Sequence, residues 1–367
     1  MRIFSKWWFW VLVIAVLAGG VGLWLFLGRN GIGGAILIGD PTVNRSDGSG
    51  VDFEIAVSPQ DSEGNPISEN VGEKNFSFLD VKVSAKNADF QTKASVAVSS
   101  IEIITPPEKG IDMALAFDNS GSMGMNEEQI NRLREDGSLP NDPDRLSIAA
   151  GKNLIDLIGA NGRAQITTFG TAPGESPSVY ATLANLEVAL KVVQDFTGDK
   201  SLLGDKIEEV DVFNGWYGTP LFNALDLALD SLFEREDQSR TPVIVAMADG
   251  EDNWSGVGAT RESVVSKAQR RNTPIFSVAF GDENTDNLQF ISRETGGIFA
   301  HSEDAEGLAA LFESIGIGIF QGRVVVVGKG SFGEEISRGD YVVTGTLRTS
   351  IGFKRVDTPF SFEITVD

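Results

Sequence analysis

Three hydrophobic patterns follow one another along this chain. Residues 7–28 form an apolar run without charge. Residues 35–109 and 320–367 alternate apolar and polar side chains with a period of two, as in "VDFEIAVS" and "FSFEITVD", which predicts strands with one buried face. Residues 110–319 alternate short apolar runs with amphipathic stretches, as in "TPVIVAMAD" followed by "RESVVSKAQRR", which predicts strands and helices in turn.

The alternation in residues 110–319 is typical of an α/β domain with a doubly wound, mostly parallel sheet covered by helices on both faces. About four strands are expected before this domain and about three after it. Joined together, they would make an all-β sandwich of the immunoglobulin-like kind, with the α/β domain inserted between its two parts, 35–109 and 320–367. Two separate small β domains are the alternative, but each would have too few strands to bury its apolar face well.

The N-terminal apolar run is long enough to cross a membrane. At about 1.5 Å per residue, its helix would span roughly 30 Å, the thickness of a bilayer core. Residues 1–6 carry Arg2 and Lys6, so the N-terminus is expected in the cytoplasm, with a linker at 29–34 leading to an extracytoplasmic bulk. A cleaved signal peptide is the alternative, but the apolar run continues beyond its small-residue cleavage positions.

Composition disfavours several classes of partner and of catalytic or metal site. The net charge of −22 and the pI of about 4.4 disfavour nucleic acid and anionic lipid surfaces as partners. Cysteine is absent and His301 is the single histidine, so thiol chemistry, His-based triads and multi-histidine metal sites have almost nothing to work with. No pairing of a nucleophile with a base is evident, and we therefore expect a binding protein and not an enzyme.

Oxygen-bearing side chains follow the apolar runs of the α/β segment. The stretch "AFDNSGSMG" places Asp118, Ser120 and Ser122 after one run, Thr219 lies in "WYGTPLFNAL", and Asp249 ends "TPVIVAMAD". The carboxyl ends of parallel strands share one sheet edge, so these five groups are expected to converge there. Oxygen ligands suit Mg²⁺, Mn²⁺ or Ca²⁺, of which Mg²⁺ is the ion we expect.

The three pieces "DNSGS", "GTP" and "ADGEDN" resemble, in order and placement, the metal-ion-dependent adhesion site of von Willebrand factor A domains. The resemblance covers about 110–318. It implies a six-stranded Rossmann-like sheet with a divalent ion at its upper edge. The hydroxyls of Ser120, Ser122 and Thr219 would be direct or water-bridged ligands, while Asp118 and Asp249 would supply charge directly or through water.

Neutral hydroxyl ligands would leave such an ion electron-poor. An Asp or Glu of a protein or matrix partner could then complete its coordination. The chain is therefore expected to be a membrane-anchored binding protein of the cell surface or periplasm. The alternative is a structural or assembly subunit of an envelope complex, in some relatives a partner of ring ATPases. Either role is compatible with a homo-oligomer or a larger assembly.

Specificity is expected from the residues around the ion. Trp216, Tyr217 and Trp254 lie on the metal loops and would either anchor a ligand or pin their own loops into the core. The segment 124–144 is long for a link between this motif and the next helix, and would be a recognition loop or a plain surface excursion. A last helix at 303–317 runs almost directly into the second β segment and could relay ligand binding to it.

Overall fold

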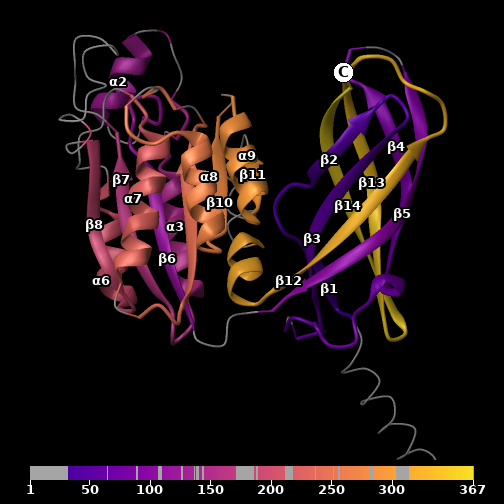
Figure 1. The fold of residues 1–367 in the computed structure, drawn as a ribbon, viewed down its shortest axis with the longest axis horizontal. Helices are drawn as coiled ribbons and strands as arrows, with labels where there is room; N and C mark the ends of the chain where they lie inside the picture. Colours follow the sequence, from indigo (N-terminus) through magenta and orange to yellow (C-terminus); the bar gives the residue numbers. More distant parts are fainter. Residues whose placement is uncertain are drawn as a thin grey trace, which may run out of the picture. The chain divides into compact units, whose positions relative to one another are not determined.

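The computed structural model describes residues 32–366 except 64, 88–89, 106–109, 125–126, 136, 138–139, 143, 171–185, 187–188, 211–217, 236, 251, 255–256, 282–283 and 303–313. The chain divides into two compact units (Figure 1). The β unit contains residues up to 37, residues 43–104 and residues 323–367. The α/β unit contains residues 38–42 and 105–322.

The α/β unit is built on a sheet that has six strands within the described residues, in the order β11-β10-β9-β6-β7-β8. Neighbouring strands run parallel, except that β8 is antiparallel to β7. The strands are β6 (Ile111–Asp118), β7 (Arg163–Phe169), β8 (Leu190–Thr197), β9 (Thr241–Ala248), β10 (Ile275–Phe280) and β11 (Phe299–Ser302). The chain order reverses on either side of β6, which makes the carboxyl end of β6 the expected ligand crevice.

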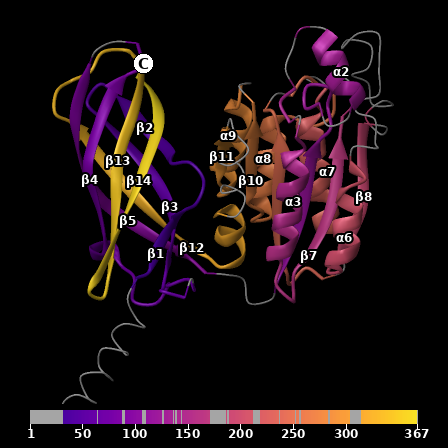
Figure 2. The same cartoon turned by 180° about the vertical axis from the view of Figure 1, so that it is seen from behind.

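Helices cover both faces of this sheet (Figures 1 and 2). Ala114 and Ala116 of β6 face the core cluster of α7 and α8, while Phe117 faces α3 and α6. A side chain on Gly151 of α3 would collide with Phe117 and with Ile207 of α6, so the glycine allows close packing there. The helices are α2 (Glu127–Glu135), α3 (Leu146–Leu157), α6 (Lys200–Ile207), α7 (Leu221–Glu234), α8 (Arg261–Arg270), α9 (Asp286–Thr295) and a helix at 314–320.

The central strands are buried on both faces. All eight positions of β6 and all six of β10 are buried. Strands covered on both faces carry continuous apolar runs, which is why these segments lack the alternation seen in the β unit. The two carboxylates of β6, Asp112 and Asp118, are buried with the rest of the strand, one near each end.

The β unit has eight strands within the described residues, joined in the path β1-β3-β12-β5-β4-β13-β14 with β2 paired to β3. The pairings along this path are antiparallel. The strands are β1 (Gly34–Leu37), β2 (Thr42–Asp47), β3 (Gly50–Gln60), β4 (Phe76–Ala85), β5 (Gln91–Ile104), β12 (Arg323–Phe332), β13 (Gly339–Ile351) and β14 (Lys354–Val366). The sequence predicted about seven strands, fewer than the eight found here, because the segments "GAIL" and "TVNRSD" are short.

Two layers of this unit face each other across an aromatic core. The ring of Phe53 on β3 lies 5.1 Å from Phe78 on β4 and 4.9 Å from Phe362 on β14, measured between centroids. β3 is not hydrogen-bonded to β4 or β14, so these rings come from opposite layers. The layers join through β5, whose first residues pair with β4 and whose remainder pairs with β12.

The α/β unit interrupts the β unit between two paired strands. β5 ends at Ile104 and β12 begins at Arg323, and these two residues are partners in the sheet register. The chain therefore leaves the β unit and returns to it at adjacent points, so strands from both sides of the interruption complete one core. This is the covalent arrangement of an inserted domain.

Two predicted helices fall on residues that are not described. The membrane helix at 7–28 lies entirely outside the described residues, and the last helix at 303–317 is described only from residue 314 onward. Within the described part of the chain, no helix has the length and hydrophobicity needed to span a bilayer.

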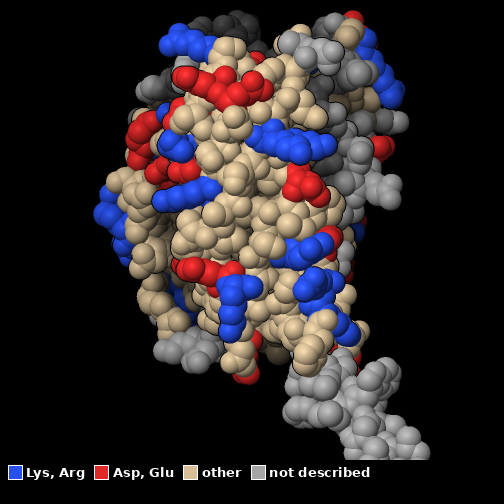
Figure 3. All heavy atoms as spheres, turned by 90° about the vertical axis from the view of Figure 1, so that its right-hand side faces the viewer, with Lys and Arg blue, Asp and Glu red and all other residues tan. Residues whose placement is uncertain are grey.

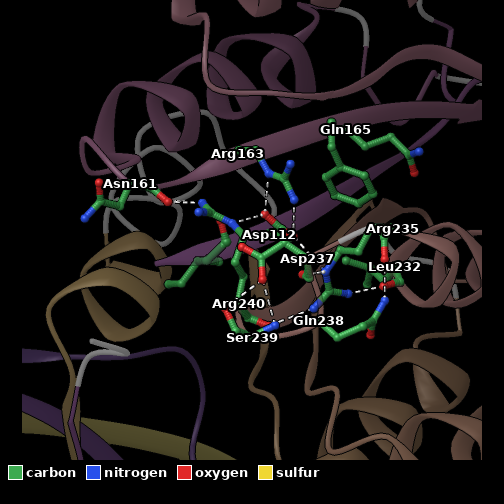
Figure 4. Close-up of polar contacts among 12 residues, drawn as sticks. Asp112, Asn161, Arg163, Gln165, Leu232, Arg235, Asp237, Gln238, Ser239 and Arg240 are labelled. Atoms are coloured by element: carbon green, nitrogen blue, oxygen red, sulfur yellow. Dashed lines mark hydrogen bonds and ion pairs between the residues drawn. The ribbon is translucent and has the colours of Figure 1, made fainter. Parts of the chain in front are cut away.

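Asp112 is the centre of an ion-pair cluster at the start of β6 (Figure 4). Arg163 donates to both of its carboxylate oxygens, at 2.9 and 2.7 Å. The Nε atoms of Arg240 and Arg235 lie 2.6 and 2.7 Å from the same carboxylate. Arg235 also donates to the carbonyl of Leu232 in α7. One buried carboxylate thus ties β6 to the start of β7, the end of α7 and the segment before β9.

The segment 38–42 joins the edge of the α/β sheet. The main-chain N–H of Asp40 donates to Phe299 O at 3.0 Å, and His301 N donates to Asp40 Oδ2 at 3.1 Å. His301 Nε2 donates to Gly281 O at 2.7 Å, so the side chain of this histidine joins β11 to the end of β10. Burial raises the pKa of Asp40 to about 6, against the opposing effect of its hydrogen bond from His301.

We expect Asp112→Asn to destabilise the α/β unit by about 3 kcal/mol, because buried guanidinium groups then lose their counter-charge. The unfolding transition of the purified chain in denaturant measures this. Asp357→Asn is the matched control, since Asp357 pairs with Arg348 at the surface of the β unit and should change stability little. Similar effects from the two variants would contradict the structural role of the cluster.

Asp40→Asn should stabilise the α/β unit in a pH-dependent way. The folded carboxyl holds its proton more tightly than the unfolded one, whose pKa is 3.8, so its contribution to stability is lost as pH rises from about 4 to 6. The advantage of the variant should therefore be small at pH 4 and reach up to about 3 kcal/mol at pH 7. Unfolding free energies of both proteins across this range test it, and a difference that does not vary with pH would refute it.

Candidate metal site in the alpha/beta unit

Two carboxylates come together at the carboxyl edge of the sheet. Asp118 is the last residue of β6, and Asp249 directly follows β9. Because β6 and β9 are parallel neighbours, the two strand ends meet at the same edge. Both side chains belong to buried residues, with exposures of 1% and 3%. The sheet topology therefore brings together two acids that are 131 positions apart in the sequence.

The turn after β6 is held in place by hydrogen bonds to neighbouring segments and within the turn. Asn119 N donates to Phe169 O at 2.7 Å, and Asn119 Nδ2 donates to Val210 O at 3.0 Å. Ser120 N donates to Asp118 Oδ1 at 2.7 Å. These bonds point the Asp118 carboxylate and the Ser120 hydroxyl to the same side of the turn.

Two serine hydroxyls connect this turn to Asp249. Ser120 Oγ and Ser122 Oγ lie 3.0 Å apart, and Ser122 Oγ donates to Asp249 Oδ2 at 2.5 Å. The alternate spacing of the serines places both hydroxyls beside the acids. Four of the five predicted oxygen groups are thereby brought into one cluster.

One oxygen of this cluster differs from the others in its hydrogen bonding. Asp118 Oδ2 is buried and has no hydrogen-bond partner among the described residues. Burial raises the pKa of Asp118 well above its usual range, and the negative charge of Asp249 raises it further, while hydrogen bonds from Ser120 oppose the shift. A buried oxygen without a donor, next to a second carboxylate, is the environment that a cation would relieve.

Thr219 is positioned through its main chain. Its N–H donates to Asn253 Oδ1 at 2.6 Å, and Asn253 N donates to Thr219 O at 3.3 Å. Asp252 accepts a hydrogen bond from Phe222 N at the start of α7, which joins the same two loops again. The structure thus ties the Thr219 loop to the Asp249 loop, but within the described residues the Thr219 hydroxyl makes no hydrogen bond to either carboxylate.

Asn141 is a member of the cluster that the motif did not identify. Its Nδ2 donates to Asp249 Oδ2 at 3.2 Å, and its main-chain N–H donates to Ser122 O at 2.9 Å. A side chain on Gly281 would collide with Asn141 Oδ1, so the glycine leaves room for this amide. The only sequence signal was its place near the end of the long segment 124–144.

Comparison with known proteins supports the fold. A family model for the von Willebrand factor type A domain matches residues 179–314, a range that includes Thr219 and Asp249 but begins after Asp118. The chain contains a von Willebrand factor type A domain. The match lies within the α/β unit described above, to which the name VWA domain refers from here on.

Solved structures with similar folds have low sequence identity to this chain. A von Willebrand factor type A protein from Catenulispora acidiphila is 10% identical, with a TM-score of 0.45, covering 81% of this chain and 75% of that one. Proximal thread matrix protein 1 from the mussel byssus, with a zinc-occupied MIDAS motif, is 16% identical, with a TM-score of 0.44, covering 64% and 50%. An aerotolerance-related membrane protein from Bacteroides fragilis is 16% identical, with a TM-score of 0.38, covering 56% and 98%.

The comparison with curated proteins finds no match.

Of the three aromatic residues expected on the metal loops, the structure describes Trp254. Trp254 is only 1% exposed and packs with Ala189, Leu186 and Val257. This contradicts an exposed ligand anchor at Trp254 and agrees with the other interpretation, in which it pins its own loop into the core. Trp216 and Tyr217 lie outside the described residues.

The residues present fit a hard divalent cation. The cluster offers two carboxylates and serine hydroxyls, and no residue in the described part of the chain donates to Asp118 Oδ2. No group of three or more His, Cys, Asp or Glu side chains within the described residues could hold a metal ion, so any ion here would depend on hydroxyl oxygens as well. Oxygen-only donors favour Mg²⁺, Mn²⁺ or Ca²⁺.

Asp118→Asn should stabilise the VWA domain without metal and remove its response to metal. The amide keeps an acceptor for Ser120 N but deletes one of two adjacent buried charges. A gain of about 1 kcal/mol would raise Tm by roughly 2–4 °C. Mg²⁺ should raise the Tm of the unmodified protein but not that of the variant.

Thermal unfolding with and without Mg²⁺ measures both effects. Asp205→Asn, which neutralises an exposed acid on α6, is the matched control and should retain the full response to Mg²⁺. A variant Asp118→Asn that Mg²⁺ still stabilises would contradict the assignment of this residue.

Proposed function

We propose that this chain is a membrane-anchored binding protein whose VWA domain captures a protein ligand through a divalent ion, with Mg²⁺ the expected ion. The observation that carries the proposal is the buried Asp118 Oδ2, which receives no hydrogen bond from the described residues and lies beside the carboxylate of Asp249. Asp118, Ser120, Ser122 and Asp249 would hold the ion, and Thr219 would join them from the neighbouring loop. VWA domains typically mediate protein interactions, which agrees with this role.

The ligand group would be a carboxylate. Ser122 already donates to Asp249, and Asn141 donates to the same oxygen, so part of the Asp249 charge is satisfied by protein donors. An ion held by hydroxyls and partly neutralised acids keeps a net positive charge. An Asp or Glu of the partner would complete its coordination and form a charge-assisted contact.

The membrane part of the proposal is supported by the sequence alone. The apolar run at 7–28 would anchor the chain as a single-pass protein, and the basic residues before it would keep the N-terminus in the cytoplasm. The β unit and the VWA domain would then lie outside the cytoplasm, where an adhesion or assembly partner is accessible. A resident envelope complex, such as one served by a ring ATPase, and a foreign protein ligand are both partners of this chemical kind.

Chelation should abolish capture of the ligand without unfolding the protein. The full chain in detergent is incubated with an envelope extract in Mg²⁺ and then in EDTA, beside the variants Asp118→Ala and Asp205→Ala. We expect retained proteins with the unmodified chain and with Asp205→Ala in Mg²⁺, and loss of more than tenfold in EDTA or with Asp118→Ala, because the ion bridges the partners.

Circular dichroism of the same samples checks that the fold persists. Capture that is unchanged in EDTA would refute the metal-dependent mechanism. Retention of stoichiometric envelope neighbours would assign the protein to an assembly role, whereas the absence of such neighbours would favour capture of a ligand from outside the envelope.

A further inference from the structure

The turn between β13 and β14 carries an exposed aromatic side chain. Ile351 pairs with Lys354, so the connecting loop is only Gly352 and Phe353. Gly352 has φ +64°, which a two-residue hairpin loop requires at its first position. The second position tolerates polar residues, yet Phe353 is there with 87% of its surface exposed. Turn geometry explains the glycine but not the phenylalanine.

Basic side chains follow this phenylalanine directly. Lys354 and Arg355 are exposed, and neither forms an ion pair within the described residues. Asp357, the next acid along β14, is held by Arg348 through two bonds of 2.7 Å, and the charge of Arg355 also contributes to lowering its pKa. Figure 3 shows Lys and Arg side chains on the lower part of this face of the molecule. The tip is therefore locally cationic and apolar, although the whole chain has a charge of −22.

Two acid-bearing segments lie near this end of the β unit. The short helix η1 (Glu73–Asn75) contacts β13 through a hydrogen bond from Asn75 to Ser350 O, and its charges Glu73 and Lys74 offset each other. The loop after β3 contributes Asp61, whose carboxylate is engaged by Asn65. Within the described residues, neither Glu73 nor Asp61 forms an ion pair with Lys354 or Arg355.

The turn lies at the end of the β unit where the chain arrives from the predicted membrane helix. Six antiparallel pairings separate β1 from β14, so the two strands run in the same sense and both begin at this end (Figure 1). Thr358 Oγ1 donates to Ala35 O at 3.5 Å, which sets β1 level with Thr358. Phe353 lies five residues before Thr358, about 17 Å further towards the same end at 3.3 Å per residue.

The linker is short enough to keep this turn near the bilayer. Residues 28–35 can span at most about 25 Å when fully extended. A projection of about 17 Å beyond the level of Ala35 covers most of that distance. An aromatic side chain beside basic residues is the composition that binds the interface of an anionic membrane.

We propose that the β13–β14 turn docks on the membrane that anchors the chain, with Phe353 in the interfacial region and Lys354 and Arg355 on anionic lipid headgroups. This inference rests on the membrane anchoring proposed above. The docked turn gives the β unit a second attachment point, so that its orientation is set by more than the glycine-rich linker at 29–34.

Site-specific fluorescence in nanodiscs tests the proposal. The chain has no cysteine, so Phe353→Cys can be labelled singly with an environment-sensitive dye in the full-length protein. Glu334→Cys, at the exposed turn after β12 at the other end of the β unit, carries the same dye as the matched control. Nanodiscs contain either phosphatidylcholine alone or phosphatidylcholine with phosphatidylglycerol, and spin-labelled lipids serve as quenchers.

We expect the dye at 353 to show blue-shifted emission and several-fold stronger quenching than the dye at 334, most strongly with anionic lipid. Adding Lys354→Glu and Arg355→Glu should remove that excess. Hydrogen exchange of the unlabelled chain should slow at 350–356 in anionic nanodiscs relative to detergent-solubilised protein, and Phe353→Ser should reverse this, which excludes insertion driven by the dye.

Equal quenching at both positions, or exchange at 350–356 that is insensitive to Phe353→Ser, would overturn the docked turn while leaving the anchor intact. Flotation of the unlabelled chain with liposomes tests the anchor separately. A chain that fails to float would remove the membrane premise and the docked turn together. Metal-dependent ligand capture in detergent is independent of both outcomes.

Discussion

The site depends on two negative charges that the sheet forces together. β6 and β9 are parallel neighbours, so Asp118 and Asp249 meet at one edge, and helices on both faces of the sheet keep the surroundings dry. Two carboxylates cannot both be ionised there at low cost. Hydrogen bonds from Ser122 and Asn141 reach Asp249, while Asp118 Oδ2 receives none from the described residues. A bound cation would resolve this imbalance, and a ligand carboxylate would share it.

The two buried acids near the ends of β6 differ in the charges that surround them. Asp112 near the start of the strand is surrounded by Arg163, Arg235 and Arg240. These pairs connect β6 to its neighbours and leave the acid with no need of an external partner. Asp118 at the other end has no cationic partner among the described residues, and a second acid lies beside it. The same residue type is structural where its charge is compensated and is a candidate for binding where it is not.

The VWA domain is covalently joined to the β unit at both of its ends. Residues 105–322 are inserted between Ile104 and Arg323, which are partners in one sheet. Both ends of the inserted domain are therefore attached to the same two strands, and these strands share the core around Phe53.

The sequence alone determined the alternation of strands and helices in the α/β unit, including β9 and α8, and the period-two strands of the β unit, because burial of these segments depends on periodicity over a few residues. It also identified the oxygen-bearing residues at strand ends, since each follows an apolar run. Tertiary structure decided what local pattern cannot encode. Examples are the edge strand β8, the burial of Trp254, the contact of Asn141 with Asp249 and the shared end of β1 and the β13–β14 turn. Each depends on residues far apart in the chain, whose pairing is settled only when the layers pack.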